Sequence, residues 1–252
     1  MIEEPFAIGH SVIHTTDPRI RVIAAVVFSF AVALCYGFTS LMFAFAVSVG
    51  SVLACRVRLG QVIKRLALVN VFVLIFWFVL PFTYPGGATY SLGPLTLHQA
   101  GIVFAAKITL KSNAILLILI AFIATMTLAT LGHTLGRLKV PEKLVFLLMI
   151  TYRYVFVIAQ EYQKIIKSIK IRGFTPKTTL HTYKTFAYVV GMLLIRASER
   201  ADRVYNAMRC RGFKGTYYSL TEFRADRRSW IFLVTVFTAT TLVIAMEFLF
   251  RF

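Results

Sequence analysis

The stretch Val22–Cys55, VIAAVVFSFAVALCYGFTSLMFAFAVSVGSVLAC, runs for 34 residues without a single charged side chain. About 20 apolar residues cross the hydrocarbon layer of a bilayer once, so this stretch is too long for one crossing. Gly37, Thr39 and Ser40 lie near its middle and predict a tight turn. We therefore expect a helical hairpin with two short arms, 22–36 and 41–54, in a thinned bilayer or against a partner.

The composition of the whole chain agrees with a membrane protein. Of its 252 residues 58% are hydrophobic and 15% are charged, whereas a soluble domain is about 45–50% apolar and about 25% charged. The 28 Lys and Arg against 10 Asp and Glu give a net charge of +18. Such a chain is too apolar for a soluble nucleic-acid-binding domain or a disordered protein. The three scattered cysteines, Cys35, Cys55 and Cys210, predict neither a disulfide framework nor a metal cluster.

Three further apolar runs predict three further spans, which makes five in total. They lie at about 66–82, 102–131 and 230–250. Lys107 and Lys111 are one helical turn apart near the start of the fourth run. They either snorkel to the interface, face a partner or line a polar cavity.

Lys and Arg are distributed unevenly among the connecting segments. The segment after the second span has four of them, and residues 132–229 hold 19 basic and 6 acidic residues. The segments 37–40 and 83–101 hold none. The positive-inside rule then predicts a cytoplasmic N-terminus, five spans and a C-terminus outside. No signal-peptide layout precedes the first span, so we expect that helix to stay in the mature protein.

Residues 132–229 are expected to form a cytoplasmic module. It separates an N-terminal membrane part with four spans, 1–131, from a C-terminal span, 230–252. Leu144–Ile158 is apolar enough to resemble another span, but Arg153 interrupts it, and whether it enters the bilayer stays open.

Two long amphipathic helices are predicted in this module. Apolar residues at three- and four-residue intervals predict the first helix, with Pro141 in its first turn and Gly173 at its end. The second is expected to have Thr175 as N-cap and Pro176 as its first residue, and to end at Gly212. Helices of roughly 30 residues are on the order of 45 Å long. They must pack on each other, on the membrane surface or on a partner.

The ends of the two helices share one sequence pattern. Residues 168–174 read SIKIRGF and residues 207–213 read AMRCRGF, 39 residues further on. One interpretation is local: a cation faces the helix dipole, Gly takes the left-handed conformation, and Phe folds back as the apolar contact of the cap. The functional interpretation is that two equivalent tips, Arg172 and Arg211, fit equivalent acidic pockets on two identical or homologous subunits.

The second of these ends, with the residues leading into it, resembles a known family. Residues 203–213 read RVYNAMRCRGF, and the N-terminal part contains His10-Ser11-Val12-Ile13-His14 followed by Asp17-Pro18-Arg19. These stretches are similar to the transmembrane T component of energy-coupling factor transporters, most closely the CbiQ type of cobalt importers. The resemblance covers nearly the whole chain, including the two long helices before the last span.

The resemblance implies an all-α integral membrane protein with about five transmembrane helices and two cytoplasmic coupling helices. Such a T component is not an enzyme and holds no cofactor; it joins two ATPase subunits, which use ATP and Mg, to a substrate-binding membrane subunit of the CbiM/CbiN kind. The family's X-Arg-X motifs correspond to Ile171-Arg172-Gly173 and Cys210-Arg211-Gly212, which seat in grooves of the ATPase subunits. Cys210 stands where the family often has Ala. The further residues expected to contact a partner or to be structural are Asp17, Pro18, Arg19, Ala207, Met208 and Phe213.

Several alternatives remain beside this interpretation. The same role in a nickel, biotin or other vitamin importer fits the residues equally, because the signal concerns coupling. A secondary permease predicts inverted repeats and charged residues at the bilayer midplane, which we do not find. A membrane-anchored structural or lipid-binding protein is the third, and the basic face suits anionic lipid in any case.

Other chemistry has little support in the sequence. The Walker A pattern is absent, so we expect no ATP hydrolysis by this chain. His10 and His14 have helical spacing with Asp17 nearby, but extra acidic ligands are missing and no metal site is expected. The start Met1-Ile2 differs from the Met-His start of the family's cobalt-binding subunit.

Overall fold

The computed structural model describes residues 16–55, 57, 59–84, 86, 89–92, 95–214 and 227–249. Its elements are α1 (Pro18–Leu34), α2 (Phe38–Ala54), α3 (Leu59–Thr83), β1 (Thr89–Leu92), β2 (Leu95–His98), α4 (Gln99–Phe122), α5 (Leu128–Arg137), α6 (Glu142–Ile171), α7 (Leu180–Cys210) and α8 (Arg227–Leu249). Contacts divide the chain into two compact units, 132–221 and the rest from 4 to 252. We call the unit with α1–α4 and α8 the bundle unit, and the unit with α6 and α7 the two-helix unit.

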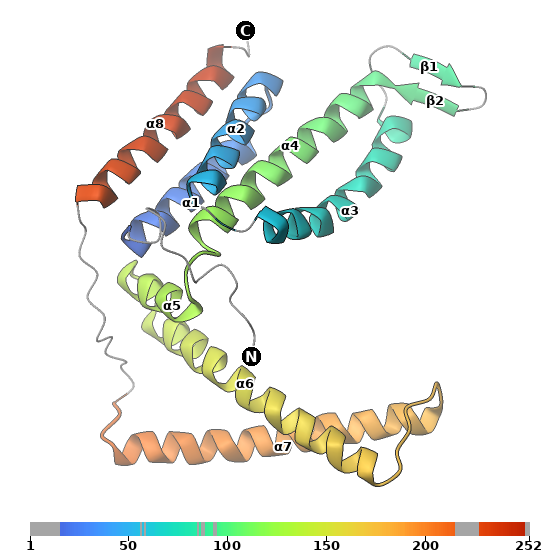
Figure 1. The fold of residues 1–252 in the computed structure, drawn as a ribbon, viewed down its shortest axis with the longest axis vertical. Helices are drawn as coiled ribbons and strands as arrows, with labels where there is room; N and C mark the ends of the chain where they lie inside the picture. The colour runs from blue at the N-terminus through green and yellow to red at the C-terminus, as the bar shows by residue number, and fades with distance from the viewer. Residues whose placement is uncertain are drawn as a thin grey trace. The chain divides into compact units, whose positions relative to one another are not determined.

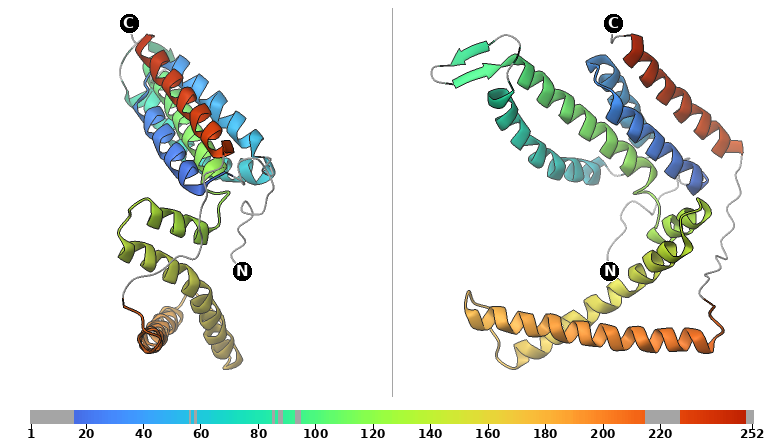
Figure 2. Two further views of the ribbon diagram at one scale, coloured as in Figure 1. Left: turned by 90° about the vertical axis from the view of Figure 1, so that its left-hand side faces the viewer. Right: turned by 180° about the vertical axis from the view of Figure 1, so that it is seen from behind.

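In the bundle unit α4 is the central helix. It packs against α1, α2 and α3, while α8 packs against α1 and α2, so that α1, α2, α4 and α8 lie side by side (Figures 1 and 2). The large side chains fully buried between these helices include Phe28, Leu41, Ile118, Phe122 and Val243. The Phe122 ring meets Phe232 of α8 edge to face at 5.0 Å between centroids. This apolar packing fixes the helices against one another.

The predicted hairpin of two short arms is confirmed. Both α1 and α2 have 17 residues, which corresponds to about 25 Å and is shorter than a hydrocarbon layer of about 30 Å. The turn between them is held by Glu247 of α8, whose carboxylate accepts hydrogen bonds from the backbone N–H of Tyr36 (2.8 Å) and Gly37 (2.8 Å) and from the Ser40 hydroxyl (2.6 Å). A Cβ at Gly37 would lie 2.9 Å from that carboxylate, so a larger residue there would displace the Glu247 side chain.

The predicted end of the fourth span is wrong. The apolar run 102–131 does not form one helix, because α4 ends at Phe122 and α5 begins at Leu128. Thr127 makes the new start: its carbonyl accepts from the Leu131 N–H and its hydroxyl from the Thr130 N–H at 3.1 Å. The 24 residues of α4 already give about 36 Å, which is enough to cross a bilayer.

A two-stranded hairpin interrupts the uncharged connection between α3 and α4. Its strands β1 and β2 pair antiparallel with Thr89 opposite His98 and Leu92 opposite Leu95. Next to it the backbones of α3 and α4 approach closely, since a Cβ at Gly101 would lie 2.3 Å from the Leu80 carbonyl oxygen. The sequence predicts only a Gly- and Pro-rich loop here, so the hairpin adds to the predicted fold.

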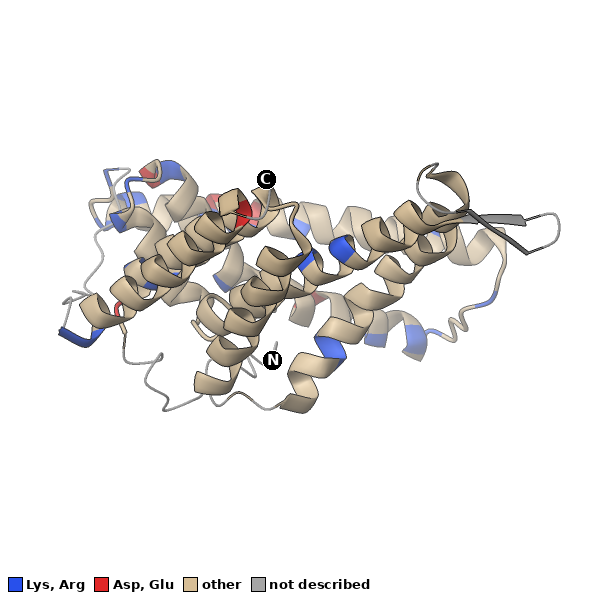
Figure 3. Cartoon of the chain, turned by 90° about the horizontal axis from the view of Figure 1, so that it is seen from above, with Lys and Arg blue, Asp and Glu red and all other residues tan. Residues whose placement is uncertain are grey.

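The membrane character of the helices is visible in their exposed surfaces. The helices α3, α4, α6 and α8 are long and apolar enough to cross a membrane. Most of each bundle helix carries no charge (Figure 3). Large apolar side chains such as Leu68, Phe72 and Phe78 of α3 are at least 65% exposed. Apolar side chains in such a position require a non-aqueous environment, and the expected all-α membrane class is confirmed.

The two-helix unit contains most of α5 and two long helices, α6 and α7, that cross (Figure 1). The predicted start of the second helix is wrong: Thr175 and Pro176 lie in the connection before α7, outside any helix, and Thr179 is the N-cap of α7. The reason is a local polar cluster, in which Thr182 accepts from the Lys177 N–H at 3.2 Å and bonds the Thr179 hydroxyl at 3.1 Å. Pro141 precedes α6 as its N-cap residue, one position from its predicted place.

Candidate functional site

The two helix ends that share a sequence pattern also share a backbone structure. At the end of α6, Gly173 N–H donates to the Lys170 carbonyl (3.0 Å) and Phe174 N–H to the Ile169 carbonyl (3.2 Å). At the end of α7 the corresponding bonds, from Gly212 and Phe213 to the carbonyls of Arg209 and Met208, are both 3.0 Å. Both glycines have φ of 82°. Each end is therefore a Schellman motif with glycine in the left-handed position, as predicted.

The phenylalanine after each glycine packs on the other helix. Phe174, which follows α6, meets Phe186 of α7 with 6.1 Å between ring centroids. Phe213, which follows α7, stacks on Phe146 of α6 at 5.3 Å. Each of these ring contacts therefore joins the end of one helix to the facing helix.

The arginines at the two tips are exposed and far apart. Arg172 and Arg211 are the C-cap residues, and Ile171 beside the first is 87% exposed. The end of α6 lies near the start of α7, whereas Arg211 lies at the opposite end of that helix (Figure 2). The 31 residues of α7 correspond to about 46 Å. Two guanidinium groups separated by roughly this length cannot enter one and the same pocket.

Glu161 joins the two helices where they cross. Its carboxylate lies 3.1 Å from Arg196 and 3.2 Å from Arg200, both on α7, and 3.3 Å from Lys164 of its own helix. The Lys164 hydrogen bond first, and then the two arginines, lower the pKa of the Glu161 carboxyl. A further pair, Glu199–Arg203 at 3.8 Å, stays within α7. The sequence predictions missed Glu161, although it is the one acidic residue among the basic ones of the second half of α6.

Next to these ion pairs the crossing helices enclose an apolar groove. Its lining comes from both helices and includes Ile150, Tyr154, Leu193, Val204 and Met208. No residue of α6 is buried, and of α7 only Thr182 and Val189 are. The predicted apolar faces of the two helices are therefore largely uncovered within the unit, so a partner or lipid has to cover them.

Comparison with known proteins agrees with these features. Residues 9–222 match the sequence profile of CbiQ, which is described as a cobalt transport protein. The chain belongs to the CbiQ family. Together with the apolar helices, this membership makes the chain an integral membrane protein.

Curated relatives of this CbiQ-family chain are named energy-coupling factor transporter transmembrane protein EcfT. The protein of Brevibacillus brevis is 27% identical, with 82% of each chain covered. That of Ruminiclostridium cellulolyticum is 28% identical over 96% of this chain and 95% of its own length. That of Bacillus subtilis is 26% identical, with 85% of both chains covered.

The remaining predicted site residues of this CbiQ-family chain lie in two places. Ala207 and Met208 belong to the last turn of α7 and thus to the second tip, together with Cys210. Asp17, Pro18 and Arg19 belong to the bundle unit. There Asp17 caps α1 by accepting from the Arg19 N–H at 3.0 Å, and Pro18 is the first helical residue, which is a structural role.

The part of the chain that the structure describes contains no candidate cluster of metal-binding side chains. No group of three or more His, Cys, Asp or Glu residues comes together there. His10 and His14 lie outside the described residues. Lys111, one of the two lysines of α4, donates to the Ala33 carbonyl at 2.7 Å and lies 4.6 Å from the centre of the Tyr36 ring. It therefore contacts the α1–α2 turn.

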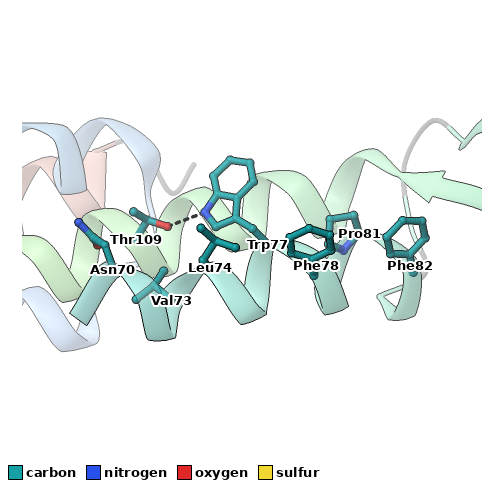
Figure 4. Close-up of a pocket in the computed structure, with 8 residues that line it drawn as sticks. All are labelled: Asn70, Val73, Leu74, Trp77, Phe78, Pro81, Phe82 and Thr109. Atoms are coloured by element: carbon teal, nitrogen blue, oxygen red, sulfur yellow. Dashed lines mark hydrogen bonds between the residues drawn. The ribbon is translucent and has the colours of Figure 1, made fainter. Parts of the chain in front are cut away.

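A shallow hollow on α3 is the other notable surface of the CbiQ-family bundle (Figure 4). It is lined by Asn70, Val73, Leu74, Trp77, Phe78, Pro81, Phe82 and Thr109. Trp77 donates to the Thr109 hydroxyl of α4 at 2.9 Å, which ties the two helices together. No charged side chain lines the hollow, so aromatic packing and lipid contact explain it better than a site for a polar ligand.

Proposed function

We propose that this chain is the transmembrane T component of an energy-coupling factor importer for cobalt ions. In this role it joins two ATPase subunits to a substrate-binding membrane subunit of the CbiM/CbiN kind. The chain itself is not an enzyme and holds no cofactor; ATP and Mg²⁺ are bound by the ATPase subunits. Membership of the CbiQ family and the name shared by the EcfT relatives support the proposal.

The observation that carries the proposal is the pair of equivalent arginine tips. Ile171-Arg172-Gly173 and Cys210-Arg211-Gly212 end their helices in one hydrogen-bonding pattern, with the arginines separated by roughly the length of α7. Two copies of one pocket, on two identical or related subunits, match this duplication. A guanidinium group prefers a pocket with carboxylates, where it forms charge-assisted hydrogen bonds.

Energy coupling follows from the way the tips are attached. Because Phe174 and Phe213 each pack on the opposite helix, and Glu161 joins α6 to α7, a movement of one tip changes the crossing of the pair. Closure of the ATPase subunits on ATP draws their pockets together and with them the two tips. The uncovered apolar faces of α6 and α7 suit contact with the substrate-binding subunit, which receives this movement.

The substrate rests on the family alone. The description of the profile as a cobalt transport protein favours cobalt, whereas the printed names of the relatives include no substrate. The same role in a nickel, biotin or other vitamin importer is the alternative within this class.

The proposed topology places the protein in the cell membrane of a bacterium or archaeon. Its N-terminus and residues 132–229 are then cytoplasmic and its C-terminus is outside, since this places the 19 basic residues of that segment inside. We assign α6 to the cytoplasmic module despite its apolar first half. The charged residues Arg153 and Glu161 interrupt its apolar sequence, and charged side chains are costly inside a bilayer.

Co-purification tests the function. The tagged chain is expressed with the ATPase and membrane subunits of candidate cobalt, nickel and vitamin importers, and the bound subunits are identified. We expect ATPase subunits with the wild type and their loss with Arg172→Ala plus Arg211→Ala, while the membrane subunit that binds Co²⁺ is retained. Retention of both ATPase subunits and of Co²⁺ uptake by the double variant would refute the proposal.

A further inference from the structure

From the first described residue, Thr16, onward the chain passes between its two units twice, and a polar residue of the bundle unit lies a few residues from each passage. The first passage lies within α5, between residues 131 and 132, and Thr125 lies in the turn that precedes this helix. The second leads back into α8, where Ser229 is the third residue of the helix. A movement of the two-helix unit reaches the bundle through these two covalent connections in any case.

Both of these residues are hydrogen-bonded to the first turn of α1. The Asp17 backbone N–H donates to the Ser229 hydroxyl at 3.0 Å, and Ser229 is 1% exposed. The Arg21 guanidinium donates through Nη2 to the Thr125 hydroxyl, which in turn donates to the Ala121 carbonyl of α4 at 2.8 Å. One helical turn of α1 therefore binds the end of α4 and the start of α8 simultaneously.

The burial of Arg21 makes this arrangement unusual. Arg21 and Thr125 are each 2% exposed, and Arg21 Nε lacks a hydrogen-bond partner in the described part of the chain. A buried guanidinium group in a membrane helix is costly, so such a residue is expected to have a role beyond packing. Asp17 is only 6% exposed, so it has little surface with which to contact a partner protein. Its contacts are made inside the bundle unit.

We propose that the first turn of α1, with Asp17 and Arg21, is a clamp that positions both passages between the units. By holding Thr125 and Ser229 on one helix end, the clamp makes the end of α4 and the start of α8 move together. A movement of α6 and α7 then displaces the end of α4 and the start of α8 together. Without the clamp, local deformation of one connection would absorb the movement. Its transport consequence rests on the proposed T-component role, and Asp17 and Arg21 act here as positioning residues.

The test removes the two acceptor hydroxyls and leaves Arg21 in place. The clamp variant is Thr125→Val with Ser229→Ala. The matched control is Thr240→Val with Ser48→Ala, because these hydroxyls are also buried but donate only within their own helices, to Val236 and Ala44. Each is purified as the complete complex with its ATPase and substrate-binding subunits and reconstituted into vesicles with Co²⁺ and ATP.

We expect the clamp variant to keep its ATPase subunits and its ATP hydrolysis, while Co²⁺ uptake per ATP falls about fivefold or more, the lower range of allosteric coupling. The control keeps the wild-type ratio. An unchanged ratio in the clamp variant, or an equal fall in the control, overturns the proposal. So does failure of the clamp variant to assemble, because the contacts then serve the fold and not the transmission.

A second measurement is independent of transport and separates the clamp from the proposed function. Spin labels are attached to the exposed Cys210 and to Cys introduced as Val234→Cys, and their distance distribution is recorded in the whole chain in lipid nanodiscs. We expect a broader distribution in the clamp variant than in wild type and control. If wild type binds no ATPase, the proposed function fails while this result still decides the clamp; equal widths overturn the clamp alone.

Discussion

Arg172 and Arg211 hold the same position in the same capping motif, although they lie 39 residues apart on two different helices. Each is the C-cap residue, each precedes a glycine with φ of 82°, and each is followed by a phenylalanine that packs on the opposite helix. A pocket that accepts one of these tips therefore accepts the other with little change.

The single variants Arg172→Ala and Arg211→Ala are expected to weaken ATPase binding to a similar extent. Removing a guanidinium group from the centre of a protein interface costs about 2 kcal/mol, which is roughly thirtyfold in affinity. The measurement is binding of the purified ATPase subunits to the chain in nanodiscs, by surface plasmon resonance at fixed ionic strength.

We do not expect loss of positive charge alone to produce such an effect. The control is Lys167→Ala with Arg203→Ala, two exposed cations on the same helices that lie five and eight residues before the tip arginines. We expect this control to bind within about twofold of wild type, since exposed charges contribute little at physiological salt. A control as weak as the tip variants would reduce the tips to ordinary surface charge.

The glycines of the two tips are predicted to be needed for their backbone conformation and not for space. A Cβ at Gly173 or Gly212 meets no atom within 4 Å, but φ of 82° strains any other L-residue. Each Gly→Ala change therefore costs about 1–2 kcal/mol or unwinds the cap and misplaces the arginine. ATPase affinity and thermal unfolding in detergent measure both effects.

Gly191 provides the comparison for this prediction. It lies within α7, a Cβ there also meets nothing within 4 Å, and its φ is ordinary for a helix. Gly191→Ala is expected to stabilise α7 by roughly 0.5–1 kcal/mol and to leave ATPase affinity unchanged. Equal effects of all three substitutions would contradict the role of the left-handed conformation.

The spans and the tips were predictable because their signals are local. An uncharged run such as Val22–Cys55 is decided by hydrophobicity and chain length alone. The Arg-Gly-Phe ends are decided by the backbone requirements of a helix C-terminus. In contrast, Thr127 starts a helix within an apolar run, and the cluster around Thr179 shifts the start of α7 toward the C-terminus. In both places hydrogen bonds of single hydroxyl groups set the helix boundary, and the hydrophobic pattern of the sequence does not show them.

Contacts between distant residues were not predictable in the same way. Glu247 caps α2 across 210 residues, and Phe213 stacks on Phe146 only because the helices cross at a particular angle. Neither pairing leaves a periodic signal in the sequence. Asp17 could be assigned as a local N-cap, but its bond to Ser229 depends on the packing of α8 against α1.

The crossing of α6 and α7 is predicted to loosen in acid. Lys164 and the two arginines lower the pKa of Glu161 below its ordinary value of 4.5. The stabilisation by these ion pairs is therefore fully present above that ordinary value and is lost as the pH falls through the lower pKa of the folded state. The difference in melting temperature between wild type and Glu161→Gln should be present at about pH 7 and vanish in acid.

Glu199→Gln is the control for the crossing. Glu199 pairs with Arg203 of its own helix at 3.8 Å and joins nothing across the crossing. We expect its melting temperature to follow that of wild type, because an exposed pair within a helix contributes little. A pH dependence in Glu161→Gln as large as in wild type would assign the acid effect to other groups.

Glu247 is predicted to stabilise the α1–α2 turn as an N-cap supplied by another helix. Glu247→Ala removes the acceptor of the Tyr36 and Gly37 N–H groups and of the Ser40 hydroxyl, so α2 loses its N-terminal hydrogen bonds. The expected loss is about 1–2 kcal/mol, the upper range for a lost cap. Thermal unfolding in detergent measures it, with Ser51→Ala as the control because the Ser51 hydroxyl donates only to Val47 of its own helix. If both variants unfold at the wild-type temperature, the turn is held by apolar packing and the carboxylate is dispensable.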